Sequence, residues 1–425
     1  MLWPVPNTQT AIVDTQTFEV ASAAPIGYSD TLDFIIKAMP KHMIERIEII
    51  SEIRVLTAAG GNPPATAVPQ VSIISNAANA LWRSVDVIID NENLLQSFDN
   101  SYNIGAWFNI ALNSPKSRAP ILLKKELFLM DEGVSYDTAN NVILPVAVGD
   151  EVQQVTTNTS STTRAAIISE GKTVVLISDL NCSLLKIEKL LPTNMDIKIS
   201  LAKNYDGYLL VDPIVGTYKI QFDKCYLRIT THQPSDLTIQ LMEKRLKIEP
   251  ALYHTEHGKF SFHPIPTGSQ LFTINNLFPQ GELPVLFTFG LQDRSAIGND
   301  RTVNPYVFGR IKKAQVFVGG VPYFSSAMEG ETMQFDAFYQ ALGYKSAGEC
   351  LIDPENYSVH PLFAIDLTAD RNANKHHLNI SRSGEVKIDL EFTPGPGLGD
   401  GYIIVVYTYY NRRIEINHER KLKIV

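Results

Sequence analysis

The clearest alternation of apolar and polar residues lies at 384–411, near the end of the chain. Four apolar residues alternate there with four charged ones. The apolar residues are Val386, Ile388, Leu390 and Phe392. Because successive side chains of a strand point to opposite faces, this pattern predicts a strand with one buried and one wet face. The Gly/Pro-rich run that follows predicts a loop. The aromatic and β-branched run 402–410 predicts a second, more deeply buried strand.

Two other segments change to the helical period, with apolar side chains at i, i+3, i+4 and i+7. These are Ile104, Trp107, Phe108 and Ala111 in the first half, and Phe335, Phe338, Tyr339 and Leu342 in the second. Gly343 is expected to end the second helix. A further helix is predicted over 119–130, with Pro120 in its first turn.

The second half of the chain repeats the order of elements predicted for the first. A strand, a helix and three strands follow one another in the first half at 82–89, 103–112, 173–180, 195–202 and 218–230. The second half gives the same order at 310–318, 333–342, 361–367, 385–392 and 402–410. Further strands are predicted earlier in each half, at 31–38, 44–56 and 71–74 in the first and at 259–263, 270–274 and 283–291 in the second. This makes about eight antiparallel strands per half, the jelly-roll arrangement. We therefore predict an all-β fold of two consecutive eight-stranded jelly rolls with short helical insertions (a double jelly roll).

These elements divide the chain into four parts. They are an N-terminal arm (1–30), a first jelly roll (31–232) with a surface insertion (131–171), a linker (233–250) and a second jelly roll (251–425). The arm is expected to hold one short strand near 17–21. The Thr/Ser-rich run 153–164 of the insertion is expected on an exposed surface. In the linker, Gln-Pro-Ser-Asp at 233–236 can cap a short helix.

Composition narrows the classes of function. Charged residues make up 19% of the chain, below the usual quarter, so we expect much of the surface to be buried against partners. The net charge of −8 and the lack of Lys/Arg clusters argue against a nucleic-acid surface. No apolar run is long enough for a transmembrane helix, and the first residues lack the features of a secretory signal, so we expect the chain not to be secreted. The cysteines are odd in number and far apart, which predicts reduced, buried thiols: Cys182, Cys225 and Cys350.

Candidate chemistry is sparse. His254, His257 and His263 form the densest histidine group, but no cysteine or carboxylate set completes a metal site with them. Exposed or hydrogen-bonding histidines are therefore favoured over a metal site. We expect solvated side chains at His376 and His377 and at the strand carboxylates Asp389 and Glu391, and a hairpin at the glycine-dense run 395–401. The sequence thus predicts no catalytic, cofactor-binding or metal-binding residues, and a protein that is not an enzyme.

Two tryptophans allow more specific expectations. Trp107 lies on a helical stripe and is predicted to be a core residue. Trp3 has no local stripe to join, so a contact with another subunit is one of the roles open to it.

Several short motifs resemble one family of viral proteins. They include Asn-Pro-Tyr-Val-Phe at 304–308, Phe-Ala-Ile-Asp-Leu-Thr at 363–368, Arg-Ile-Glu-Ile-Asn at 413–417 and Ser-Phe-Asp-Asn-Ser-Tyr at 97–102. Shorter matches lie at 275–278, 283–284 and 289–291. Together with the repeated half, these motifs resemble the double-jelly-roll major capsid proteins, the lineage of adenovirus hexons, virophages, polintons and adintoviruses.

The resemblance implies a structural protein of an icosahedral virion. Its members form homotrimers of pseudo-hexagonal outline that tile a shell, so the expected partners are two further copies, neighbouring capsomers, and penton and minor capsid proteins. It implies that long loops such as 131–171 project outward or contact neighbours, and that the N-terminal arm lies beneath the shell. Assembly would take place inside the host cell, without sequence-specific nucleic-acid binding. Whether a membrane lies beneath the shell stays open.

Two alternatives remain at this stage. One is a receptor- or glycan-binding β-sandwich, such as a vertex or spike protein, which would present one exposed binding pocket and no tiling trimer. The other is an enzyme built on a β-sandwich, which would need clustered His/Glu ligands or two facing carboxylates. The sequence offers neither arrangement.

Overall fold

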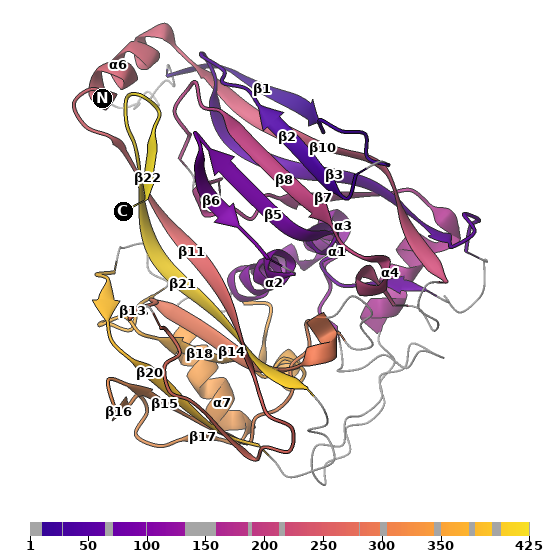
Figure 1. Cartoon of the computed structure of the whole chain (residues 1–425), viewed down its shortest axis with the longest axis vertical. Coiled ribbons are helices and arrows are strands. Elements are labelled where there is room, and N and C mark those ends of the chain that lie inside the picture. The colour runs from indigo at the N-terminus through magenta and orange to yellow at the C-terminus, as the bar shows by residue number, and fades with distance from the viewer. Residues whose placement is uncertain are drawn as a thin grey trace, which may run out of the picture.

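The computed structural model shows two β-sandwiches that follow one another along the chain (Figure 1). It describes residues 11–27, 29–63, 71–98, 100–131, 159–185, 189–211, 217–279, 281–297, 304–343, 350–373, 379–392 and 401–424. In Figure 1 the first sandwich runs from indigo to pink and the second from orange to yellow, with helix α2 between them. In the described part of the chain, no helix has both the length and the apolar character needed to cross a bilayer.

The first sandwich consists of two four-stranded sheets. One contains, in spatial order, β1 (Ile12–Ala21), β10 (Tyr218–Pro234), β3 (Met43–Thr57) and β7 (Val174–Asp179). The other contains β2 (Thr31–Ile36), β8 (Ile197–Lys203), β5 (Trp82–Ile89) and β6 (Glu92–Gln96). A short pair outside these sheets joins β4 (Ser72–Ile73) to β9 (Leu210–Val211).

The second sandwich repeats this topology. One sheet contains β11 (Ala251–Pro264), β21 (Tyr402–Ile416), β14 (Leu286–Asp293) and β18 (Phe363–Asp366), with β22 (Leu422–Ile424) added to β21. The other contains β12 (Leu271–Ile274), β20 (Val386–Glu391), β15 (Lys313–Val318) and β16 (Val321–Pro322), with β17 (Met328–Glu329) also paired to β15. A short pair joins β13 (Glu282–Leu283) to β19 (Arg382–Ser383).

Counted within each half without the short extra strands, both sandwiches have the spatial orders 1-8-3-6 and 2-7-4-5. All the strand pairs are antiparallel. Eight antiparallel strands in two such sheets form a jelly roll. The structure thus confirms the predicted duplicated jelly roll.

Helices enter both halves at the same place, between the fifth and sixth strands. The first half has α2 (Ser101–Asn113), α3 (Ala119–Glu126) and α4 (Thr159–Ile168) there; the second has α7 (Glu331–Phe338), its π-helical extension Tyr339–Gly343, and α8 (Pro354–Tyr357). The remaining helices are α1 (Ala77–Ala80), α5 (Asp206–Leu209) and α6 (Asp236–Leu246). The helical stripes predicted around Trp107 and Phe338 are therefore confirmed. The helix predicted over 119–130 ends earlier, because Leu127 adopts a left-handed conformation.

The alternation that predicted the strand at 385–392 corresponds to its burial in the structure. In β20, Val386, Ile388 and Leu390 are buried in the core of the second sandwich. Between them, Lys387 and Asp389 lie on the outer face, where they form an ion pair of 2.8 Å. The loop that follows, 393–400, lies outside the described residues.

The N-terminal region differs in part from the predicted arm. Ile12–Ala21 forms β1, which pairs with β10 from Ile12↔Pro234 to Ala21↔Tyr226. The sequence signal was weak because β1 is an edge strand with one exposed face and one face that is only half-buried. We therefore propose that the first jelly roll begins near Ile12 rather than at residue 31, with the other domain limits as predicted. Residues 1–10, which include Trp3, lie outside the described residues.

The prediction of an exposed surface for 153–164 is wrong for the part that the structure describes. Thr159–Ile168 forms α4, and Ser160, Ser161 and Arg164 are buried. The hydroxyl of Ser160 donates to the carbonyl of Met130 at 2.7 Å. Ser160 and Arg164 tolerate burial because their side chains have hydrogen-bond partners, which a composition argument does not detect. Residues 132–158 of the insertion lie outside the described residues.

The linker helix follows its predicted cap. The Ser235 side chain accepts a hydrogen bond from the backbone N–H of Thr238, and α6 begins at Asp236. This is the N-cap arrangement expected from the sequence.

Candidate functional site: the junction between the two sandwiches

Helix α2 brings aromatic side chains of the first half onto the second. The ring of Trp107 stacks on that of Tyr306, with centroids 5.5 Å apart and planes inclined by 4°. One residue later, Phe108 stacks on Tyr407 at 5.3 Å. The buried core of the first sandwich therefore continues without a break into side chains of the second. This confirms Trp107 as a core residue and shows that the core it joins spans both halves.

Asp131 lies at the centre of a set of buried polar residues that connects both halves. This set, called here the Asp131 cluster, consists of Asp131, Arg164, Asn304 and His360. One carboxylate oxygen of Asp131 accepts from Arg164 Nη2 at 2.7 Å, and the other accepts from Asn304 Nδ2 at 2.5 Å. The backbone carbonyl of Asp131 lies 3.1 Å from His360 Nε2. Arg164 belongs to the first half, whereas Asn304 and His360 belong to the second. All four residues are buried.

Further hydrogen bonds compensate the burial of these groups. Arg164 Nε donates to the carbonyl of Ile73 at 2.7 Å. His360 Nδ1 lies 2.8 Å from the carbonyl of Tyr306. Burial lowers the pKa of His360, and its contacts with the backbone carbonyls of Tyr306 and Asp131 oppose this shift.

A buried ion pair costs desolvation energy, but removing one partner leaves the other charge buried and uncompensated. Such a network is stable only when every member keeps its geometry. The Asp131 cluster and the stacked rings of α2 therefore hold the two sandwiches in one relative orientation.

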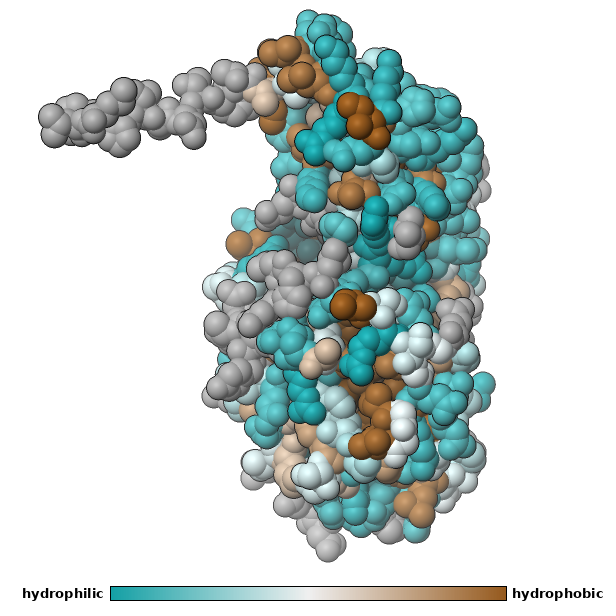
Figure 2. Space-filling model, turned by 90° about the vertical axis from the view of Figure 1, so that its left-hand side faces the viewer, coloured by the Kyte–Doolittle hydropathy of each residue, from teal (hydrophilic) through white to brown (hydrophobic). Residues whose placement is uncertain are grey.

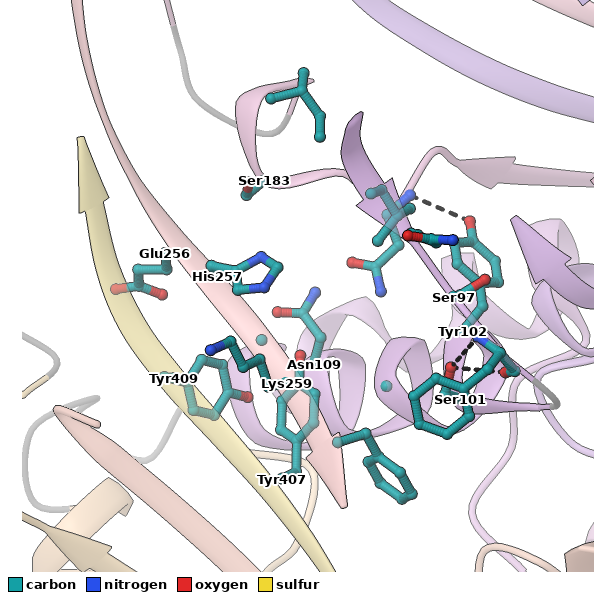
Figure 3. Close-up of a pocket in the computed structure, with 18 of the residues that line it drawn as sticks. Ser97, Ser101, Tyr102, Asn109, Ser183, Glu256, His257, Lys259, Tyr407 and Tyr409 are labelled. Carbon is teal, nitrogen blue, oxygen red and sulfur yellow. Dashed lines mark hydrogen bonds between the residues drawn. The ribbon is translucent and has the colours of Figure 1, made fainter. Parts of the chain in front are cut away.

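A cleft of about 530 Å³ lies beside this junction (Figure 3). The first half contributes Ser97, Ser101, Tyr102, Asn109 and Ser183 to its walls, and the second contributes Glu256, His257, Lys259, Tyr407 and Tyr409. In Figure 3 the His257 ring points from β11 toward Asn109 of α2. Groups from both sandwiches thus face one space.

The cleft is poorly suited to acid–base chemistry at neutral pH. Burial, with the positive charges of Arg412 and Lys259 nearby, lowers the pKa of His257 to about 3. Burial also raises the pKa of the Tyr407 and Tyr409 hydroxyls well above their usual range. A general base works best when its pKa is near the working pH, so neither group is adjusted for that role.

The three histidines singled out by the sequence do not converge. All lie on β11, where one residue advances the chain by about 3.3 Å and successive side chains alternate between faces. His257 and His263 are therefore roughly 20 Å apart along the strand. His254 is exposed and lines the same cleft as His257. Within the described ranges, no three His, Cys, Asp or Glu side chains are grouped as metal ligands would be.

The other residues named in the sequence analysis lie in surface ion pairs, in buried positions or outside the described residues. Asp389 and Glu391 lie on the outer face of β20 and pair with Lys387 and Lys312. The three cysteines are free and buried, as predicted. Burial raises the pKa of Cys225 to about 12 and that of Cys350 to about 11. His376, His377 and most of the glycine run 395–401 lie outside the described residues.

Sequence reasoning missed the Asp131 cluster. Its members are far apart in the chain, and no periodic pattern marks them. Asn304 lies inside a motif that carried the family resemblance, which was the only available signal.

No protein-family model and no curated protein matches the sequence. Solved structures match it over its full length. A chain of the Sputnik virophage, solved by cryo-electron microscopy, gives a TM-score of 0.64 at 9% identity and covers 100% of this chain and 90% of its own. The PBCV-1 virus capsid gives 0.61 at 10% identity, with 100% and 99% covered. The mavirus major capsid protein gives 0.56 at 11% identity, with 100% and 93% covered.

At these identities the similarity establishes the fold. The repeated strand order and the full-length coverage agree, and both sandwiches are matched. The chain therefore has the double-jelly-roll fold of viral major capsid proteins.

Proposed function

We propose that this chain is the major capsid protein of an icosahedral virus or virus-like element, and that it acts by assembly. The observation that carries the proposal is the repeat itself: two consecutive jelly rolls of identical strand order, matched over the full length by chains of virus capsids. The proteins of mavirus and Faustovirus that share this fold are described as major capsid proteins.

The proposed capsomer is a homotrimer. Three copies with two sandwiches each place six similar units around one axis, which gives a pseudo-hexagonal outline able to tile a shell. This role requires each chain to present its sandwiches at one fixed angle. The junction supports that requirement, because stacked rings of α2 and the Asp131 cluster connect the two halves.

Lateral contacts between copies are proposed on the outer faces of the sheets that contain β2 and β12. Leu271 of β12 is 73% exposed and Val321 of β16 is 65% exposed. Ile35 of β2 is also exposed. In Figure 2 apolar side chains gather on the lower half of the face shown, where the second sandwich lies. Obligate interfaces bury large apolar areas, so these side chains are suitable contacts within a trimer.

The further partners are proposed from the same role. They are neighbouring capsomers, penton proteins and minor capsid proteins, and the place of action is the capsid of the virion. The chain contributes no catalysis to this function. Loops between the strands would make the weaker contacts between trimers.

Size-exclusion chromatography with light scattering, followed by negative-stain imaging, tests the proposal. We expect a particle of three times 47.3 kDa with a hexagonal outline. A stable monomer that does not assemble at high concentration, or with its shell partners, would contradict it. A monomer that binds a glycan or a receptor through the cleft would favour the vertex or spike alternative.

A further inference from the structure

The linker helix α6 presents apolar side chains on the side where a surface helix normally carries polar ones. Leu237 and Leu241, called here the outer stripe, are 67% and 57% exposed, and Ile248 in the turn that follows the helix is 86% exposed. At 3.6 residues per turn, the directions of Leu237 and Leu241 around the helix axis lie about 40° apart. Leu246, the buried anchor of α6, points about 180° away from Leu237. The outer stripe is therefore a second apolar face, opposite the one that packs on the protein.

The N-terminal segment leaves the described structure beside this helix. The carbonyl of Ala11 accepts hydrogen bonds from the backbone N–H of Ser235 at 2.8 Å and from the hydroxyl of Thr238 at 3.3 Å. Ala11 is therefore held at the first turn of α6. The ten residues before it read Met-Leu-Trp-Pro-Val-Pro-Asn-Thr-Gln-Thr, six apolar residues followed by four polar ones.

We propose that residues 1–6 dock on the outer stripe of α6 of the same chain, with Trp3 as the main contact. The length of the segment allows this. Trp3 is eight residues from Ala11, a reach of up to roughly 26–29 Å, whereas α6 with its eleven residues is only about 17 Å long. The four polar residues serve as the connection, and the six apolar ones reach every part of the stripe.

The chemistry of the two surfaces is complementary. Leu2, Trp3 and Val5 supply apolar area that would otherwise be exposed, as would Leu237 and Leu241. Lys244 lies on the same side of α6 as the outer stripe, and a tryptophan ring can cover both the aliphatic stem and the ammonium group of a lysine. Because the tether is short, the local concentration of the segment is on the order of millimolar, which favours the chain's own helix over that of another copy.

Tryptophan fluorescence of the full-length protein tests the proposal. Trp82 and Trp107 are buried, so the signal lost in a Trp3→Phe variant isolates Trp3. We expect that signal to be shielded from acrylamide in the wild-type protein. A double variant Leu237→Glu, Leu241→Glu should raise the quenching constant of Trp3 by about twofold or more, because the apolar contact is lost. Ile121→Glu, which alters an exposed apolar residue of another helix, α3, is the matched control and should leave Trp3 shielded (Figure 1).

Two outcomes would overturn the inference. One is a wild-type Trp3 that is quenched as readily as a free tryptophan derivative, a result that needs no folded variant. The other is shielding that grows with protein concentration, which would place the segment on another copy. Both outcomes are distinguishable from a failure of the proposed capsomer, because the oligomeric state is measured separately by light scattering.

Discussion

Gly258 lies at the junction between the two sandwiches, where there is no space for a side chain. A Cβ atom built on Gly258 would lie 2.7 Å from Cζ of Tyr407 and closer still to its hydroxyl. Tyr407 in turn stacks on Phe108 of the first half, so its ring cannot move away freely. We expect Gly258→Ala to lower the free energy of unfolding by about 1–3 kcal/mol through overpacking, measured by urea denaturation.

Two comparisons make this prediction specific. Gly27→Ala is the control, since nothing lies within 4 Å of the Cβ added there. Tyr407→Phe, which removes the nearest atom, should restore part of the loss in a Gly258→Ala background. Equal losses for Gly258→Ala and Gly27→Ala would rule out the steric explanation.

The buried ion pair of Arg164 and Asp131 should be far more sensitive than an exposed one. Arg164→Met removes the positively charged partner of the buried Asp131 carboxylate, which also accepts from Asn304, and we expect a loss of about 3–5 kcal/mol in denaturant unfolding. Arg245→Met breaks an exposed pair with Glu249 and should cost at most about 1 kcal/mol. Adding Asp131→Asn to Arg164→Met should recover stability. An Arg164→Met protein as stable as Arg245→Met would mean that the cluster does not hold the junction.

The lowered pKa of His257 predicts that the folded protein loses stability on mild acidification. Its pKa is about 3 in the folded chain, because of burial and the nearby Arg412 and Lys259, against about 6.5 when unfolded. Below pH 6.5 the unfolded state binds a proton that the folded state does not, so the free energy of unfolding falls as the pH falls. For this one group the loss between pH 7 and pH 5 is about 1–2 kcal/mol.

Urea denaturation at pH 7 and pH 5 measures this loss, and the interval avoids most of the titration of carboxylates. His257→Gln should weaken the pH dependence without abolishing it, since burial also lowers the pKa values of His263 and His360. His254→Gln, which alters an exposed histidine of the same strand, should retain the full dependence. Identical pH profiles for both variants would contradict the assignment to His257.

At the scale of elements, α2 does more than fill one sandwich. Trp107 of α2 and Tyr306 of the second half stack almost in parallel, and such pairs contribute about 0.5–1.5 kcal/mol beyond the area that they bury. A double-mutant cycle with Trp107→Leu and Tyr306→Leu should give a coupling energy in this range. A cycle between Trp107 and Phe363, which packs in the separate core of the second sandwich, should give a coupling near zero. Additive effects in both cycles would show that the stack contributes nothing specific.

The elements also show what the sequence could reveal. Alternation predicted β20, and the period of 3.6 residues predicted α2 and α7, because each has one face in a core. The aromatic and β-branched run predicted β21, which is buried on both faces along most of its length. The shared position of these helices revealed the duplication. The same reasoning assigned only a short strand where β1 lies, because an edge strand buries little. It also missed the Asp131 cluster, in which Asn304 and His360 are more than a hundred residues away from Asp131 in sequence.

At the scale of the whole molecule, the proposed trimer depends on faces that a single chain leaves exposed. Leu271 and Val321 lie on the outer face of the second sandwich and contribute little to its core. Leu271→Asp combined with Val321→Asp should therefore leave the unfolding of a single chain nearly unchanged, since exposed substitutions usually alter stability by about 0.5 kcal/mol or less. The same two substitutions should weaken trimerisation strongly, because unpaired carboxylates would be buried in the interface.

Light scattering across a dilution series measures this effect as a shift from trimer to monomer. Val13→Asp provides the matched control, because Val13 is equally exposed at 68% but lies on the edge strand β1 of the other sandwich, away from the proposed face. A trimer that survives the Leu271 and Val321 changes but dissociates with Val13→Asp would move the interface to the edge of the first sandwich. A loss of trimer in the first variant alone, with folding intact, would tie assembly to the β12–β16 face rather than to the stability of the jelly roll.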